Sequence, residues 1–190
     1  MEITTWYLEM LEPAWLRPAA AVPVPVTRAE VVSPELNRYL YTAVGGDWYW
    51  VDRLGWTWRR WRDWLARPGV ETWVALDRGT PAGYVELDPA DGSVELAYFG
   101  LLPDFVGRGL GGHLLTEAIR RAWTLADRWP DLPPTRRVWV HTCSTDGPAA
   151  LANYEARGLR VYRTERETVT PSPEPPGPWP GADRPSADRP

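Results

Sequence analysis

The segment Leu101–Gly112, "LLPDFVGRGLGG", contains the residue types that point most directly to chemistry. Four glycines fall within the six residues 107–112, between a predicted strand and a predicted amphipathic helix. Without Cβ atoms, successive backbone N–H groups converge on one ligand, and the positive end of a helix dipole favours an anion there. The pattern predicts a cradle for phosphate groups.

The same segment also satisfies the spacing G-x-G-x-x-G of dinucleotide-binding proteins, at Gly107, Gly109 and Gly112. That motif belongs to a tight strand-to-helix turn in a parallel sheet and requires a carboxylate about 20 residues further on, at the end of a second strand. Here the turn is longer, and Asp127 falls where a helix should end. The dinucleotide interpretation is therefore disfavoured.

The elements that would position this segment follow from hydrophobic periodicity and turn residues. Ser33 marks a helix start as an N-cap, and Trp58, Trp61 and Leu65 share one face of a second helix. Three strands joined by short Gly/Pro turns predict an antiparallel meander. We expect strands at 3–10, 70–77, 84–88, 93–102, 136–143 and 159–169, and helices at 33–44, 57–66, 110–125 and 147–158. This order predicts an α+β fold with a mixed α/β sheet.

Length and composition suit one domain, which we place at residues 1–170 of the 190. Residues 171–190 are rich in Pro, Gly, Ser and Asp and are predicted to be a disordered tail. No window approaches the roughly 20 apolar residues of a membrane span, and the N-terminus lacks a signal-peptide pattern. Both observations favour a cytoplasmic protein without a membrane partner.

The charged and metal-binding residue types exclude several further classes. A net charge of −4 argues against a nucleic-acid partner, although the Trp/Arg-rich stretch 48–65 would suit base stacking. Cys143 is the only cysteine, and His113 and His141 have no metal-ligand spacing, so we expect neither a disulfide nor a metal. The chain contains no lysine, which excludes covalent catalysis by lysine.

The glycine-rich segment resembles motif A of the GNAT superfamily of N-acetyltransferases, Arg/Gln-x-x-Gly-x-Gly/Ala, at residues 106–111. Val106 stands where the family usually has Arg or Gln. The preceding "LLPDF" is similar to the family's Val-x-Pro element, and "AALANYEARGL" resembles its Tyr-x-x-x-Gly-Phe helix, with Tyr154, Gly158 and Leu159. The resemblance covers roughly residues 30–168 and implies a GNAT-like acyl-CoA-binding fold, with a central, mostly antiparallel sheet flanked by helices.

The resemblance implies acetyl-CoA as co-substrate. Its pyrophosphate would be held by backbone N–H groups of the glycine-rich segment, which any side chain at Val106 leaves intact. The implied cofactor-binding residues are Leu101, Leu102, Val106, Gly107, Arg108, Gly109, Leu110, Gly111, Gly112 and Asn153.

Acyl transfer to an amine needs a neutral amine, a donor for the developing oxyanion and a proton for the departing thiolate. The resemblance implies Tyr154 as the proton donor and a backbone N–H near Leu101 as the oxyanion donor. Glu95 lies eleven residues before motif A, at the offset of the catalytic glutamate in histone-type members, and is the predicted general base. Glu86 on the preceding strand and His141 are the alternatives.

The segment 48–65 falls where GNAT-like proteins wall the acceptor site, so its tryptophans have two interpretations. They either form a core face or bind an ammonium group, with Trp48, Trp50 and Trp56 near Asp47, Asp52 or a glutamate such as Glu86. The second interpretation predicts a small-molecule amine with ring or apolar character.

The sequence therefore predicts an acetyl-CoA-dependent N-acetyltransferase that acetylates a primary amine of a small molecule by direct attack on the thioester. Two alternatives stay open: a protein or peptide N-acetyltransferase, and a sensor with the same fold that binds acyl-CoA without turnover. A homodimer is also left open.

Overall fold

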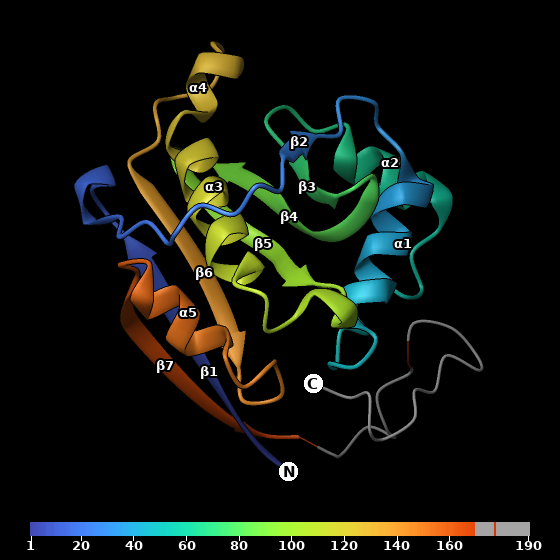
Figure 1. Ribbon diagram of the computed structural model, residues 1–190, viewed down its shortest axis with the longest axis vertical. Helices are drawn as coiled ribbons and strands as arrows, with labels where there is room; N and C mark the ends of the chain where they lie inside the picture. The colour runs from blue at the N-terminus through green and yellow to red at the C-terminus, as the bar shows by residue number, and fades with distance from the viewer. Residues whose placement is uncertain (170–176, 178–190) are drawn as a thin grey trace.

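The computed structural model describes residues 1–169 and Gly177; the rest of the predicted tail lies outside the described residues. These residues form a seven-stranded sheet of order β2-β3-β4-β5-β6-β1-β7, antiparallel except between β5 and β6 (Figure 1). The strands are β1 (Glu2–Met10), β2 (Val26–Arg28), β3 (Glu71–Asp77), β4 (Thr80–Ala90), β5 (Ser93–Leu101), β6 (Arg137–Cys143) and β7 (Arg160–Thr168). The helices are α1 (Pro34–Gly45), α2 (Trp58–Leu65), α3 (Leu110–Trp123), α4 (Leu125–Arg128) and α5 (Ala150–Ala156). The predicted mixed α/β class with a mostly antiparallel sheet is confirmed.

The turns of the meander are shorter than the sequence predicted. Arg78 and Gly79 join β3 to β4, and Asp91 and Gly92 join β4 to β5, with φ values of 50°, 86°, 50° and 79°. Two-residue turns with positive φ match the twist of the strands they connect. β4 therefore begins at Thr80, four residues earlier than expected.

Helix starts follow the predicted capping chemistry, whereas one strand was not predicted. Ser33 Oγ accepts a hydrogen bond from Leu36 N at 3.2 Å at the start of α1, and Thr57 caps α2 in the same way. β2 lies in a proline-rich connection and pairs with β3. The predicted helix over 110–125 is interrupted at Thr124, after which α4 begins.

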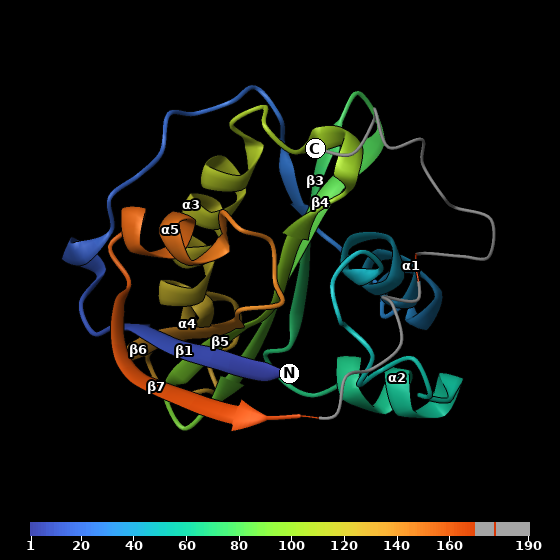
Figure 2. The ribbon, with the colours of Figure 1, turned by 90° about the horizontal axis from the view of Figure 1, so that it is seen from below.

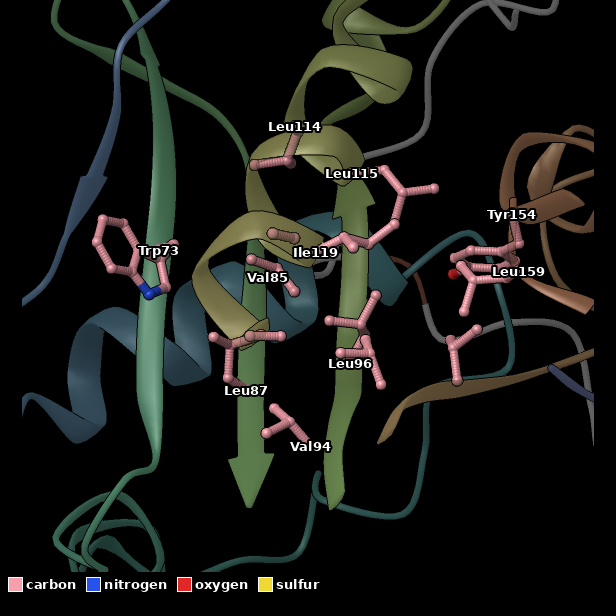
Figure 3. Packing of buried hydrophobic residues seen from close by; sticks show 14 of the residues in the cluster. Trp73, Val85, Leu87, Val94, Leu96, Leu114, Leu115, Ile119, Tyr154 and Leu159 are labelled. Carbon is pink, nitrogen blue, oxygen red and sulfur yellow. The ribbon is translucent and has the colours of Figure 1, made fainter. Parts of the chain in front are cut away.

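Helices cover both faces of the sheet (Figures 1 and 2). Leu114 and Ile119 of α3 pack with Leu96 of β5 in the main core on one face (Figure 3). On the other face, α1 and α2 lie over β3, β4 and β5, where Leu40 packs with Tyr84. Among the described residues, no helix covers this second face over the half of the sheet formed by β6, β1 and β7 (Figure 2).

Strands β5 and β6 pair over only part of their length. Their parallel register covers Ser93–Glu95 and Arg137–Trp139, whereas the strands continue to Leu101 and Cys143. Beyond the register, the facing edges of the two strands diverge, and their backbone groups have no partner in each other. An opening therefore forms in the middle of the sheet.

Candidate active site

A cavity of about 730 Å³ occupies this opening. Its walls come from the diverging ends of β5 and β6, the glycine-rich segment, α5, the loop after β6, and the loop after α1. The cavity reaches from Gly107 and Gly111 on one side to Trp48, Trp50 and Asp52 on the other. Three segments that sequence analysis singled out separately thus contribute to one cavity.

The glycine-rich segment adopts a conformation that depends on glycine. Gly107 and Gly109 have φ values of 79° and 77°, in the left-handed region, and Gly109 is the N-cap of α3. No side chain in the described part of the chain caps this end of the helix. Its first N–H groups and the helix dipole are therefore available to an anion.

The predicted cofactor residues divide into two groups. Leu101, Val106, Gly107, Gly111 and Asn153 line the cavity. The others, which do not line it, are Leu102, Arg108, Gly109, Leu110 and Gly112; of these, Arg108 donates a hydrogen bond to Asp77 at 2.8 Å and Leu110 is buried in the core.

Tyr154 lines the cavity from α5 and is 5% exposed. Its ring packs against Phe99 of β5 at a centroid distance of 5.8 Å, and Leu159 lies beside it (Figure 3). Burial, followed by the charge of Asp146, raises the pKa of Tyr154. The phenol therefore stays protonated through the neutral range, as a proton donor must.

Glu95 and His141 form a pair where β5 and β6 begin to diverge. His141 Nδ1 lies 3.1 Å from Glu95 Oε1. His141 lines the cavity and Glu95 does not. The hydrogen bond with Glu95 raises the pKa of His141, burial lowers it, and the charges of Glu95, Asp146 and Asp52 raise it further, for a net rise.

The end of the cavity away from the glycine-rich segment combines aromatic rings with a carboxylate. Trp48, Trp50 and Asp52 line it, and Asp47 does not. Tyr41 and Tyr98 donate hydrogen bonds to the two oxygens of Asp52, at 2.7 and 2.5 Å. Burial raises the pKa of both phenols, so they remain donors that fix the carboxylate in place.

The structure corrects the predictions that Glu86 and Trp56 contact an amine substrate, because neither lines the cavity. Glu86 is 1% exposed and accepts hydrogen bonds from Arg53 Nη1 at 2.8 Å, Trp64 Nε1 at 2.7 Å and Asn37 Nδ2 at 3.3 Å. With its oxygens occupied by these donors, Glu86 is unsuited to act as a base.

Trp56 belongs to an aromatic cage around Arg53, which is 4% exposed. The guanidinium carbon lies 4.5, 4.3 and 4.2 Å from the ring centroids of Trp56, Trp64 and Tyr98, and 5.4 Å from that of Trp61. Several tryptophans of segment 48–65 therefore surround a cation that belongs to the chain itself. Trp58, predicted on the buried face of its helix, is 54% exposed.

Sequence reasoning missed Tyr98, because strict alternation in β5 would place it on the same face as Val94 and Leu96. The register shifts where Glu86 pairs with Tyr98 and Leu87 with Leu96, which leaves Ala97 as an extra residue. This bulge turns Tyr98 to the opposite face, toward Asp52. No feature of the sequence marks the bulge.

The fold and the cavity define a mixed α/β protein with a ligand site between two diverging parallel strands. The chain belongs to the acetyltransferase (GNAT) family, whose sequence model matches residues 37–159. No curated protein matches the chain in sequence. The helices in the described residues are too short or too polar to cross a membrane.

Solved structures share this fold. A GCN5-related N-acetyltransferase from Sphaerobacter thermophilus is 19% identical, with a TM-score of 0.58 over 92% of this chain and 54% of that one. A GCN5-related N-acetyltransferase from Kribbella flavida is 22% identical, with a TM-score of 0.57 over 85% of this chain and 55% of that one. The chain thus spans little more than half the length of these neighbours, which show the fold alone.

Proposed function

We propose that this protein is an acetyl-CoA-dependent N-acetyltransferase whose acceptor is a primary amine of a small molecule. The observation that carries the proposal is the single cavity that joins the glycine-rich segment to an aromatic, acidic acceptor end, with Tyr154 on its wall. Membership of the GNAT family supports acyl transfer as the reaction.

The co-substrate would enter between β5 and β6. The N–H groups at the start of α3 would bind its pyrophosphate, and Gly107 and Gly111 allow close approach of the backbone. Leu101 lies at the end of β5, beyond the register with β6. Backbone N–H groups on this edge of β5 are the proposed donors to the thioester oxygen as it gains charge.

Tyr154 is the proposed acid, because its buried phenol is protonated and lies on the cavity wall. As the C–S bond breaks, the sulfur takes the proton from the Tyr154 hydroxyl, and solvent reprotonates the phenolate. Glu95 is proposed to act in removal of the proton from the amine.

Trp48, Trp50 and Asp52 are the proposed acceptor contacts. A carboxylate beside aromatic faces favours a cation with an apolar or ring-shaped body. Both tryptophans line the cavity, and their apolar rings beside the Asp52 carboxylate favour a small amine with an apolar or ring-shaped body as the acceptor.

The test is calorimetric titration with acetyl-CoA, followed by measurement of free thiol release against a panel of primary amines. Tyr154→Phe should bind acetyl-CoA with unchanged affinity and release thiol at least about tenfold more slowly. Tyr39→Phe, on an exposed part of α1, is the matched control and should behave as wild type. Binding without release would favour the sensor, and absence of binding would overturn the proposal.

A further inference from the structure

We propose that His141 is the group that takes the proton from the amine, through its Nε2 atom, and that Glu95 is a positioning residue that acts through His141. This inference rests on the proposed acetyl transfer and refines the role given to Glu95. The observation behind it is that His141 lines the cavity whereas Glu95 does not, and that Glu95 Oε1 lies at hydrogen-bond distance from Nδ1 of the ring.

The hydrogen bond to Glu95 determines which nitrogen of His141 is the base. An ionised carboxylate only accepts hydrogen bonds, so Nδ1 of the neutral imidazole must carry the proton that it donates to Glu95. Nε2 then holds the lone pair. No residue in the described part of the chain makes a hydrogen bond to Nε2, so this atom is free to accept a proton from a ligand.

Glu95 itself is poorly placed to be the base. Its side chain is 18% exposed, against 48% for His141, and Oε1 is engaged with the imidazole. The imidazole of His141 is therefore more accessible than the carboxylate of Glu95 to a proton from an amine in the cavity. A carboxylate behind a histidine orients the ring and stabilises the imidazolium that forms.

The charged groups that face His141 all favour its protonated form, which burial alone opposes. Glu95 faces it from β5, Asp52 from the loop after α1 and Asp146 from the loop after β6. The ring of Tyr7 on β1 lies 5.9 Å away, and its hydroxyl is bonded to Glu165 of β7. On β6 itself the neighbouring ring is Trp139, at 6.1 Å. None of these groups is a cation, so nothing among them opposes the imidazolium.

The proposed reaction transfers protons at His141 and at Tyr154. The ammonium group of the substrate first gives one proton to solvent; the neutral amine then attacks the thioester carbon, an N–C bond forms, and the nitrogen gives its next proton to Nε2 of His141. The tetrahedral intermediate collapses, the C–S bond breaks, and the sulfur takes a proton from Tyr154. His141 then releases its proton to solvent and Tyr154 regains one, which leaves an amide and a free thiol.

The experiment compares the pH dependence of kcat/KM in wild type, His141→Gln and Glu95→Gln. In wild type, kcat/KM should fall toward acid pH as His141 becomes protonated. His141→Gln should lose this acid limb and fall at least about tenfold at its plateau. Glu95→Gln keeps an acceptor for Nδ1 but removes the charge, so the limb should move to lower pH with a smaller loss at the plateau.

An NMR titration gives a readout that does not depend on turnover. The chain has two histidines, so in untagged His113→Gln every imidazole signal belongs to His141. Its pKa should fall when Glu95→Gln is added. His113 hydrogen-bonds the carbonyl of Val24 outside the cavity, so His113→Gln alone should leave the acid limb unchanged. Added imidazole should partly restore turnover to His141→Ala, which a purely structural role would not allow.

Two results would overturn the inference in distinguishable ways. If wild type transfers acetyl groups and the limb survives in His141→Gln but vanishes in Glu95→Gln, Glu95 is the base and the proposed function stands. If wild type binds acetyl-CoA but acetylates no amine, the proposed function is wrong, and so is the role proposed for His141 as the base.

Discussion

The tryptophan-rich segment builds two aromatic regions that differ in what fills them. In the first, Trp56 and Trp64 surround Arg53, whose charge is paired with Glu86 at 2.8 Å. In the second, Trp48 and its neighbours line a cavity beside a carboxylate fixed by two phenols. The first region contains a cation of the chain itself, Arg53. In the second region the carboxylate of Asp52 lines the cavity, where a cation from outside can bind.

The two glutamate pairs show the same contrast. Glu86 and Arg53 are 1% and 4% exposed, and Glu95 and His141 are 18% and 48% exposed. A closed pair of charges has no access to a ligand, and loss of one partner destabilises the fold because the other charge stays buried and unpaired. An open pair exchanges protons with a ligand or solvent, so it contributes to reactivity. Changes in the closed region, around Arg53 and Glu86, should therefore affect the free energy of unfolding. Changes in the open region, where Trp48, Asp52 and His141 line the cavity, should affect kinetics.

The largest expected effect is in the closed region. Arg53→Met leaves Glu86 buried without its cation and should lower the free energy of unfolding by about 3–5 kcal/mol. Urea denaturation measures this loss. Arg59→Met, on the exposed face of α2, is the control and should change stability by no more than about 0.5 kcal/mol. If Arg53→Met and Arg59→Met both lowered the free energy of unfolding by the same small amount, the aromatic cage would not depend on its cation.

Two tryptophan variants test whether the regions separate function from stability. Trp56→Ala should lower the free energy of unfolding by about 2–3 kcal/mol, less than for a fully buried tryptophan, without changing KM for the amine. Trp48→Ala should raise that KM about three- to tenfold with little change in stability. The measurements are urea denaturation and steady-state kinetics, with exposed Trp58→Ala as the control.

The sequence predicted most of the fold, because the periodic helices and the alternating strands carry their own pattern. It did not predict β2, whose three residues become a strand only by pairing with β3. The glycine-rich segment was recognised because its spacing is local. The sequence did not show which tryptophans surround Arg53 and which line the cavity. That difference depends on the burial of Arg53 and on the change of face of Tyr98 at the bulge. Both are long-range effects that local pattern does not encode.

Asp52→Asn tests the charge of the open region with little change of shape. The amide oxygen still accepts a hydrogen bond from one of the two phenols, Tyr41 or Tyr98, but the attraction for an ammonium group is lost. KM for a cationic amine should rise about fivefold, the equivalent of ~1 kcal/mol for one exposed charge pair. Acetyl-CoA affinity should stay the same. Asp63→Asn on exposed α2 is the control, and an unchanged KM in Asp52→Asn would remove Asp52 from the acceptor site.

The smallest expected effect concerns stability in acid and a second closed carboxylate, Glu71. Burial raises the pKa of Glu71, but hydrogen bonds from Arg128, Trp73 and Trp129 more than reverse this, so its pKa lies below the ordinary value. Such a group adds stability that is complete above the unfolded pKa of about 4.3 and is lost as pH falls through the lower folded pKa.

Thermal unfolding between pH 6 and 3 should therefore show a steeper loss of Tm in wild type than in Glu71→Gln, whose side chain does not titrate. Glu167→Gln, an exposed residue of β7, should follow the wild-type curve. The acid limb of kcat/KM should be unchanged in Glu71→Gln, because Glu71 does not line the cavity. A shift of that limb would mean that a closed carboxylate acts on the open pair of Glu95 and His141, and the separation between closed and open groups would fail.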